Sequence, residues 1–117
     1  MGSRSAPALH RLPAGSVRPM GWALAQIARD LEEGFAGCLD ALSPHVRRDL
    51  FRNRIASSAD QMAWWDAESR GNWLWGYTLM ANLAGLRPHE ERAAGLIKSL
   101  MDTQGDDGYL GIFCLSG

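Results

Sequence analysis

The segment from about residue 72 to 84 is apolar almost all the way round, and this feature constrains the fold more than any other. Its apolar residues are Trp73, Leu74, Trp75, Tyr77, Leu79, Met80, Ala81, Leu83 and Ala84. A helix without a polar face must be enclosed by neighbours on several sides. Gly85 then stands where a left-handed C-cap is expected. The segment is therefore predicted to be a buried helix.

The next segment, about 88–103, has the pattern of a helix with a single apolar stripe. Pro88 suits a helix start, and the apolar stripe consists of Ala93, Leu96, Ile97, Leu100 and Met101. An apolar helix joined by a short loop to a one-striped helix indicates an antiparallel pair, with the apolar helix inside. Three helices cannot enclose the inner one, so we expect the chain to be the first part of a larger helical domain.

The upstream half is also predicted to be helical. Apolar residues recur at three- and four-residue spacing from Gly21 to Leu42, which predicts one amphipathic helix that ends before Pro44. Residues 45–61 allow one short helix, with four arginines that form either a solvated face or an anion site. Residues 1–19 are expected to be an extended N-terminal segment and residues 20–117 part of one domain. The predicted fold class is all-α.

Charge and composition argue against several classes of protein. The chain has 12 Lys+Arg and 13 Asp+Glu, and this balance lacks the basic excess of a nucleic-acid binder. No apolar run reaches the length of a membrane-spanning helix, and no secretory signal is recognisable, which indicates a cytoplasmic protein. Cys38 and Cys114 are too far apart for a recognised metal-binding motif, and Cys38 falls on an apolar stripe.

The stretch from Trp64 to Trp75 is the main candidate for a binding site. It contains four indoles together with Asp66 and Glu68, and we expect its residues before Asn72 to be the loop that leads into the apolar helix. Indoles stack on the apolar faces of sugars or bases, and carboxylates accept hydrogen bonds from sugar hydroxyls. The alternative is that Asp66 or Ser69 caps the helix while the indoles fill the core. Both interpretations stay open from the residues alone.

The acidic, glycine-containing segment 104–111 is expected to be a structural turn. It lacks the alternating oxygen ligands of a calcium-binding loop and the GK[ST] of a phosphate-binding loop. The three histidines are far apart in sequence, and no nucleophile motif is present. The residues therefore offer no metal site and no catalytic residue.

Three stretches in order resemble one protein family. They are residues 15–27 with 33–40, residues 64–76, and residues 93–104 with 107–111. Together they resemble the β-L-arabinofuranosidase-like glycoside hydrolases (family 127), over about residues 12–113. The resemblance implies that the chain is the N-terminal portion of an (α/α)6 toroid, about one and a half helical hairpins of it.

The resemblance also implies a function. Members of the family cleave glycosides with retention, and characterised members use a zinc-bound cysteine nucleophile. The matched region lies before those residues in the family, so no catalytic or zinc-binding residue is assigned here, and the chain alone is expected to be inactive. Carbohydrate is the implied partner, with Trp65, Glu68 and Asn72 as substrate contacts and Asp66 as the helix cap.

Two alternatives stay open. The segment 104–111 also resembles turns in other helical toroids, such as terpene cyclases. The chain could instead be a helical module that binds a protein through exposed indoles and does no chemistry. In either case, we expect that the indoles near the apolar helix are partly exposed and that this surface can drive self-association.

Overall fold

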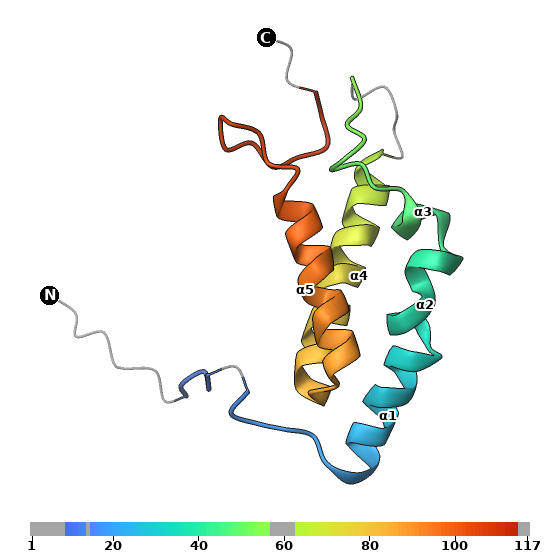
Figure 1. The fold of residues 1–117 in the computed structure, drawn as a ribbon, viewed down its shortest axis with the longest axis vertical. Coiled ribbons are helices and arrows are strands. Elements are labelled where there is room, and N and C mark those ends of the chain that lie inside the picture. The colour runs from blue at the N-terminus through green and yellow to red at the C-terminus, as the bar shows by residue number, and fades with distance from the viewer. Residues whose placement is uncertain (1–8, 14, 57–62, 115–117) are drawn as a thin grey trace, which may run out of the picture.

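The computed structural model describes residues 9–13, 15–56 and 63–114, and within these ranges the protein is helical (Figure 1). The helices are α1 (Gly21–Glu32), α2 (Phe35–Leu42), α3 (Pro44–Arg47), α4 (Ala63–Ala84) and α5 (Arg87–Met101). The only β-pairing among the described residues is one isolated parallel bridge between Ile55 and Phe113. The predicted all-α class is confirmed.

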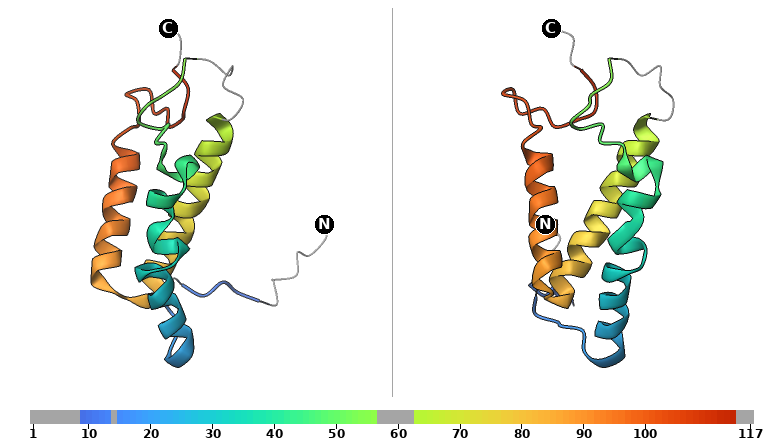
Figure 2. Two further views of the ribbon diagram at one scale, coloured as in Figure 1. Left: turned by 90° about the vertical axis from the view of Figure 1, so that its right-hand side faces the viewer. Right: turned by 45° about the vertical axis from the view of Figure 1, so that its right-hand side comes forward.

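The long helix α4 lies in the middle of the molecule. It contacts α5 on one side and the α1–α2–α3 arm on the other (Figures 1 and 2). Helices α4 and α5 run antiparallel and are joined by a short link in which Gly85 has a φ of 64°. The Gly85 N–H donates to the Ala81 carbonyl oxygen at 3.1 Å. The predicted C-cap and the predicted antiparallel pair are both confirmed.

The predicted single helix over 21–42 is wrong, because the chain breaks between α1 and α2 at Glu33–Gly34. A Cβ atom at Gly34 would overlap Asp30, and a Cβ atom at Gly37 would overlap the Leu31 carbonyl. These two glycines let α2 approach the end of α1 closely. The apolar periodicity continues through the break, which is why the sequence pattern does not reveal it.

Pro44 both follows one helix and starts the next. Helix α2 ends at Leu42, as predicted, and Pro44 occupies the first turn of α3. The Ser43 hydroxyl accepts a hydrogen bond from the Val46 N–H at 3.4 Å and caps the N-terminus of α3. Helix α3 is a single turn, and the chain continues through turns to the Ile55 bridge.

Helix α4 begins nine residues earlier than the predicted start at Asn72. The Trp64–Gly71 stretch is therefore helical, and its prediction as a loop is wrong. Gly71 and Asn72 have low helix propensity, but a cost of about 1 kcal/mol for Gly71 and less for Asn72 is small beside the packing of a 22-residue helix. Helix α5 agrees with its prediction to within about two residues at each end.

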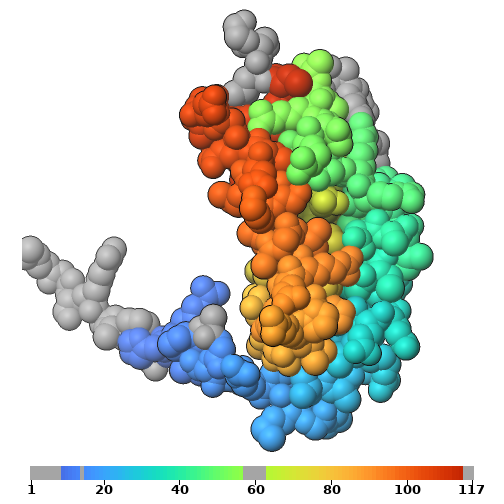
Figure 3. Space-filling view, in the orientation of Figure 1, coloured from blue at the N-terminus to red at the C-terminus, as the bar shows by residue number. Residues whose placement is uncertain are grey.

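The core lies between α4 and the other helices. Its largest cluster contains Leu31, Ala36, Val46, Trp73, Leu74, Tyr77, Ala81 and Ala93. A smaller cluster of Leu50, Ala63 and Ile112 closes the end near the β-bridge. Figure 3 shows α5 packed beside the segment that carries α2 and α3 on one face of the molecule. Every helix in the described ranges is too short or too polar to cross a lipid bilayer.

Candidate functional site

Helix α4 carries four hydrogen-bonded polar side chains in one line along its buried face. These side chains belong to Asp66, Arg70, Trp73 and Tyr77, spaced at i, i+4, i+7 and i+11, which puts them on one line along the helix. Apolar residues alternate with them, so the face combines packing with fixed polar partners. We call this line of four residues the anchor line.

Asp66 begins the anchor line, and it is only 3% exposed. Its Oδ1 atom lies 2.6 Å from His45 Nδ1, and its Oδ2 atom accepts a hydrogen bond from Arg48 Nη1 at 2.9 Å. The prediction of Asp66 as a helix cap is wrong, because Asp66 lies inside the first turn of α4 and pairs with side chains from α3 and its following turn. Its carboxylate is used to hold α3 against α4.

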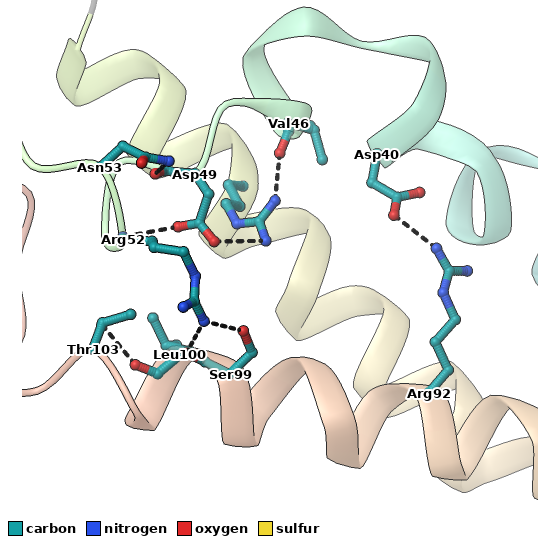
Figure 4. Close-up of polar contacts among 10 residues, drawn as sticks. Asp40, Val46, Asp49, Arg52, Asn53, Arg92, Ser99, Leu100 and Thr103 are labelled. Atoms are coloured by element: carbon teal, nitrogen blue, oxygen red, sulfur yellow. Dashed lines mark hydrogen bonds and ion pairs between the residues drawn. The ribbon is translucent and has the colours of Figure 1, made fainter.

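Arg70 extends this attachment by one turn. It donates to the Val46 carbonyl oxygen at 2.8 Å and pairs with the Asp49 carboxylate at 3.3 Å. Arg52, in the turn after α3 that also carries Asp49, donates to the Ser99 hydroxyl of α5 at 2.8 Å (Figure 4). The turn after α3 is thereby fixed to both long helices.

Trp73 and Tyr77 complete the anchor line in the centre of the core. The indole N–H of Trp73 donates to the Ala36 carbonyl oxygen at 3.0 Å, and Tyr77 Oη lies 2.9 Å from His89 Nδ1. The Trp73 and Tyr77 rings stack with centroids 5.7 Å apart. Both side chains are therefore packed in the core with their polar atoms hydrogen-bonded.

Arg92 of α5 links this centre to α2. Its guanidinium lies 4.8 Å from the Tyr77 ring centroid and donates to the Gly37 carbonyl oxygen and to the Asp40 carboxylate, each at 2.8 Å (Figure 4). Burial lowers the pKa of Arg92, but the bonds to Asp40 and Tyr77 outweigh it, so the pKa is raised above its ordinary value. The guanidinium stays charged and structural.

The opposite side of α4 forms an exposed face. Its members are Trp64, Trp65, Glu68, Gly71, Asn72, Trp75, Leu79, Asn82 and Leu83. Trp64 is 55% exposed, Trp65 48% and Trp75 68%, while Trp73 on the buried face is 7% exposed. The expectation of partly exposed indoles is confirmed for three of the four.

The three predicted contact residues, Trp65, Glu68 and Asn72, all lie on this exposed face. Their spacing of i, i+3 and i+7 brings them onto one side of the helix. Within the described ranges, no hydrogen bond or ion pair engages the Glu68 carboxylate. Asp66 points to the opposite face, so these two carboxylates diverge, as expected for a helix.

A pocket of about 280 Å³ opens between α4, α5 and the turn after α3. It is lined by Asp49, Phe51, Arg70, Gly71, Leu74, Trp75, Thr78, Ile97 and Leu100. The Asp49–Arg70 ion pair forms its one charged edge, and apolar side chains form most of the remaining wall.

The segment 104–111 forms a turn, as predicted. The Gly105 N–H donates to the Tyr109 carbonyl oxygen at 2.9 Å, and Gly108 has a φ of 85°. Arg54 lies over the Tyr109 ring, 5.0 Å from its centroid, and also donates to the Thr103 carbonyl oxygen. Arg48, Arg52 and Arg54 each hold a partner in another segment, and Arg47, Arg48 and Arg52 are exposed, as the solvated-face interpretation expects.

Zinc, which the family resemblance implies for longer relatives, does not fit the described residues. Across residues 9–13, 15–56 and 63–114, no group of three or more His, Cys, Asp or Glu side chains is placed to hold a metal ion. Cys38 is partly buried in α2, and Cys114 is exposed next to the β-bridge. Neither cysteine has the companions that a zinc site needs.

Comparisons of the chain with models of protein families, with curated proteins and with solved structures found no match. The anchor line and its partners were missed by the sequence reasoning. The heptad spacing of Asp66, Arg70, Trp73 and Tyr77 is the signal that could have found it.

Proposed function

We propose that the chain is the N-terminal part of an (α/α)6 glycoside hydrolase domain resembling β-L-arabinofuranosidases, and that it contributes carbohydrate contacts. One observation carries the proposal. The exposed face of α4 presents an indole, an unpaired carboxylate and a carboxamide side by side, in Trp65, Glu68 and Asn72. These are the groups that together recognise a sugar, one by stacking and two by hydrogen bonding.

Each of the three side chains has a separate task in this proposal. Trp65 offers a half-exposed indole to the C–H face of a sugar ring. The Glu68 carboxylate accepts hydrogen bonds from hydroxyl groups, and the Asn72 carboxamide both donates and accepts them. Trp65 and Asn72 lie about 10 Å apart along the helix axis, with Glu68 between them.

The difference between α4 and α5 supports the toroid part of the proposal. Helix α4 carries large apolar side chains on its exposed face as well as on its buried face, whereas α5 carries charged side chains on its outer side, among them Arg87, Glu91 and Lys98. In a ring of helical hairpins, the inner helix is covered on both sides, and the outer helix meets solvent. Helix α4 has the composition of the inner partner.

The proposal assigns binding to this chain and no step of bond cleavage. Hydrolysis of a glycosidic bond needs two reacting groups on opposite sides of the bond. Glu68 is the one carboxylate on the exposed face of α4, and Asp66 is 3% exposed and paired with the side chains of His45 and Arg48. A second reacting group beside Glu68 is absent from the described part of the chain.

Binding is tested by saturation-transfer NMR with methyl β-L-arabinofuranoside. We expect transfer to the sugar protons in the wild-type chain and at least a fivefold reduction in Trp65→Gln. Trp22→Gln is the matched control, because Trp22 is 85% exposed and belongs to α1, whereas the three proposed contacts belong to α4. Absence of transfer in the wild type, or equal loss in both variants, would contradict the proposal.

Hydrolysis is tested with an aryl β-L-arabinofuranoside and the purified 117-residue chain. We expect no turnover above the rate without protein. Turnover that Glu68→Gln abolishes would show that Glu68 reacts with the substrate, and the assignment of binding alone would then be wrong.

The second candidate function, a helical interaction module, is favoured by a different observation. Trp75 is 68% exposed and stands at the edge of a pocket whose walls are mostly apolar. This part of the surface suits a protein partner better than a sugar.

A further inference from the structure

The pocket between α4 and α5 has the size and the walls of a site for an aromatic side chain. Its volume is about 280 Å³, and apolar cavities of roughly 150 Å³ already hold benzene. Phe51, Leu74, Trp75, Ile97 and Leu100 supply the apolar walls. An indole is larger than benzene and fits within this volume.

Trp75 projects beside the mouth of the pocket that it helps to line. Its ring is 68% exposed, and the surface around it continues with Leu79, one turn further along α4, which is 49% exposed. On α5, Ile97 is 39% exposed and Met101 is 50% exposed. The molecule therefore presents an apolar projection and an apolar hollow next to each other.

The polar groups around the pocket present no unpaired charge to a partner. Asp49 and Arg70 form an ion pair, and Arg70 also donates to the Val46 carbonyl oxygen. Thr78 lines the pocket, and its hydroxyl is the one buried side-chain polar atom without a hydrogen bond in the described ranges. An indole N–H in the pocket is a suitable donor for that hydroxyl.

We propose that two copies of this chain form a twofold-symmetric dimer in which Trp75 of each copy enters the pocket of the other. A twofold interface brings the same patch of each subunit against itself, so it must be self-complementary. A projection adjacent to a hollow of matching size meets that condition. The patch is also free of net charge, so the two copies do not repel each other there.

The area of the patch places the dimer interface in a size class. The exposed parts of Trp75, Leu79, Ile97 and Met101, with the pocket walls, amount to about 500 Å² per copy and about 1,000 Å² in total. This total lies at the lower limit for specific interfaces, so we expect a weak dimer in rapid exchange. The proposed sugar contact Trp65 lies ten residues away, about 15 Å along the helix, and stays outside the pocket.

Sedimentation equilibrium of the full chain between about 5 and 500 μM tests the proposal. We expect the average mass of the wild type to rise from 12.8 kDa towards twice that value. Trp75→Gln removes the projection and should stay at 12.8 kDa throughout. Trp22→Gln removes an indole of even greater exposure outside the patch and should behave as the wild type.

Gly71→Gln blocks the pocket without removing the indole. Gly71 lines the pocket, and a Cβ atom added there meets nothing within 4 Å, so the monomer accommodates the side chain. We expect this variant to stay monomeric with an unchanged helical circular dichroism spectrum. Its failure to prevent dimerisation would show that the pocket is not the receptor for Trp75.

Three other results would overturn the dimer: a wild-type mass that stays at 12.8 kDa, a mass that passes the dimer value, or equal weakening by Trp22→Gln. The saturation-transfer NMR experiment with methyl β-L-arabinofuranoside is interpreted separately. Loss of dimerisation in Trp75→Gln with unchanged sugar binding supports the pocket, whereas loss of sugar binding in Trp65→Gln with unchanged dimerisation concerns the proposed function alone.

Discussion

The buried and exposed faces of α4 are nearly equal in apolar character but differ in their polar partners. Trp73 and Trp75 are two residues apart, yet the first is 7% exposed and the second 68%. The Trp73 N–H donates to the Ala36 carbonyl oxygen, while the Trp75 N–H has no hydrogen-bond partner in the described ranges. Hydrophobicity alone therefore does not decide which side of this helix faces the core.

The anchor line decides which side of α4 faces the core. Asp66, Arg70, Trp73 and Tyr77 each carry a polar group that needs a partner when buried, and each finds one on α2, α3, the turn after α3 or α5. Rotation of α4 about its axis would place apolar side chains where these bonds now form and would leave several buried polar groups unpaired, at a cost of about 1–3 kcal/mol each. A helix with large apolar side chains on both faces can therefore be oriented by its few buried polar residues.

The largest expected difference in the free energy of unfolding is between the substitution of a buried aromatic residue and that of an exposed one. Tyr77 is 1% exposed, so Tyr77→Ala should lower the free energy of unfolding by about 3–5 kcal/mol through loss of burial and the cavity left behind. Trp75→Ala should change it by less than about 0.5 kcal/mol in the monomer. Urea denaturation at low protein concentration measures both. Equal losses would show that the exposed face is packed in solution.

The second comparison uses two carboxylates. Asp66→Ala should cost about 2–3 kcal/mol, because two charged-group hydrogen bonds are lost. The cost stays below that of a fully buried pair, since the side chains of His45 and Arg48 are 47% and 43% exposed and can be rehydrated. Glu68→Ala is the matched control and should be neutral within about 0.5 kcal/mol. A neutral Asp66→Ala would remove the basis for the anchor line.

The third comparison isolates one hydrogen bond. Trp73→Phe removes the N–H that binds the Ala36 carbonyl oxygen and keeps an aromatic ring in place. We expect a loss of about 1–2 kcal/mol, because the buried carbonyl is left without this donor. Trp65→Phe, on the exposed face, should leave the unfolding midpoint in urea where it is. If both variants shifted the midpoint alike, the indole bond would not distinguish the faces.

The sequence predicts the helices well where local signals suffice. The apolar stripe of α5, the Gly85 cap and the antiparallel α4–α5 pair all follow from spacing and capping residues close together in the chain. The start of α4 is not predicted, because Gly71 and Asn72 resemble a helix boundary, and the partners that stabilise the first two turns come from α3 and the turn after it.

The candidate site is predicted only in part, because local spacing indicates some of its residues and not the distant partners of others. Periodicity places Trp65, Glu68 and Asn72 together once α4 is known to start at Ala63, and their exposure follows from their position opposite the anchor line. The function of Asp66 could not be predicted locally, because its partners His45 and Arg48 are 21 and 18 residues away. The pocket also needs Asp49 and Phe51 from the turn after α3, and no local pattern specifies how that turn lies against α4 and α5.

The smallest expected effect on stability is that of a glycine substitution at Gly71 in α4, and a glycine substitution at the α1–α2 junction should have the opposite sign and a larger size. Gly71 lies in α4 with an ordinary helical φ, and nothing lies within 4 Å of an added Cβ atom. Gly71→Ala should therefore raise the free energy of unfolding of the monomer by about 0.5–1 kcal/mol, because alanine loses less backbone entropy on folding. Gly37→Ala should lower it, since the added Cβ atom would overlap the Leu31 carbonyl and force α2 away from α1. Thermal unfolding of both variants at a concentration below dimerisation gives the two signs. If Gly71→Ala destabilised the monomer, a neighbour would have to contact the exposed face even there, and the distinction between the two faces of α4 would no longer describe the protein in solution.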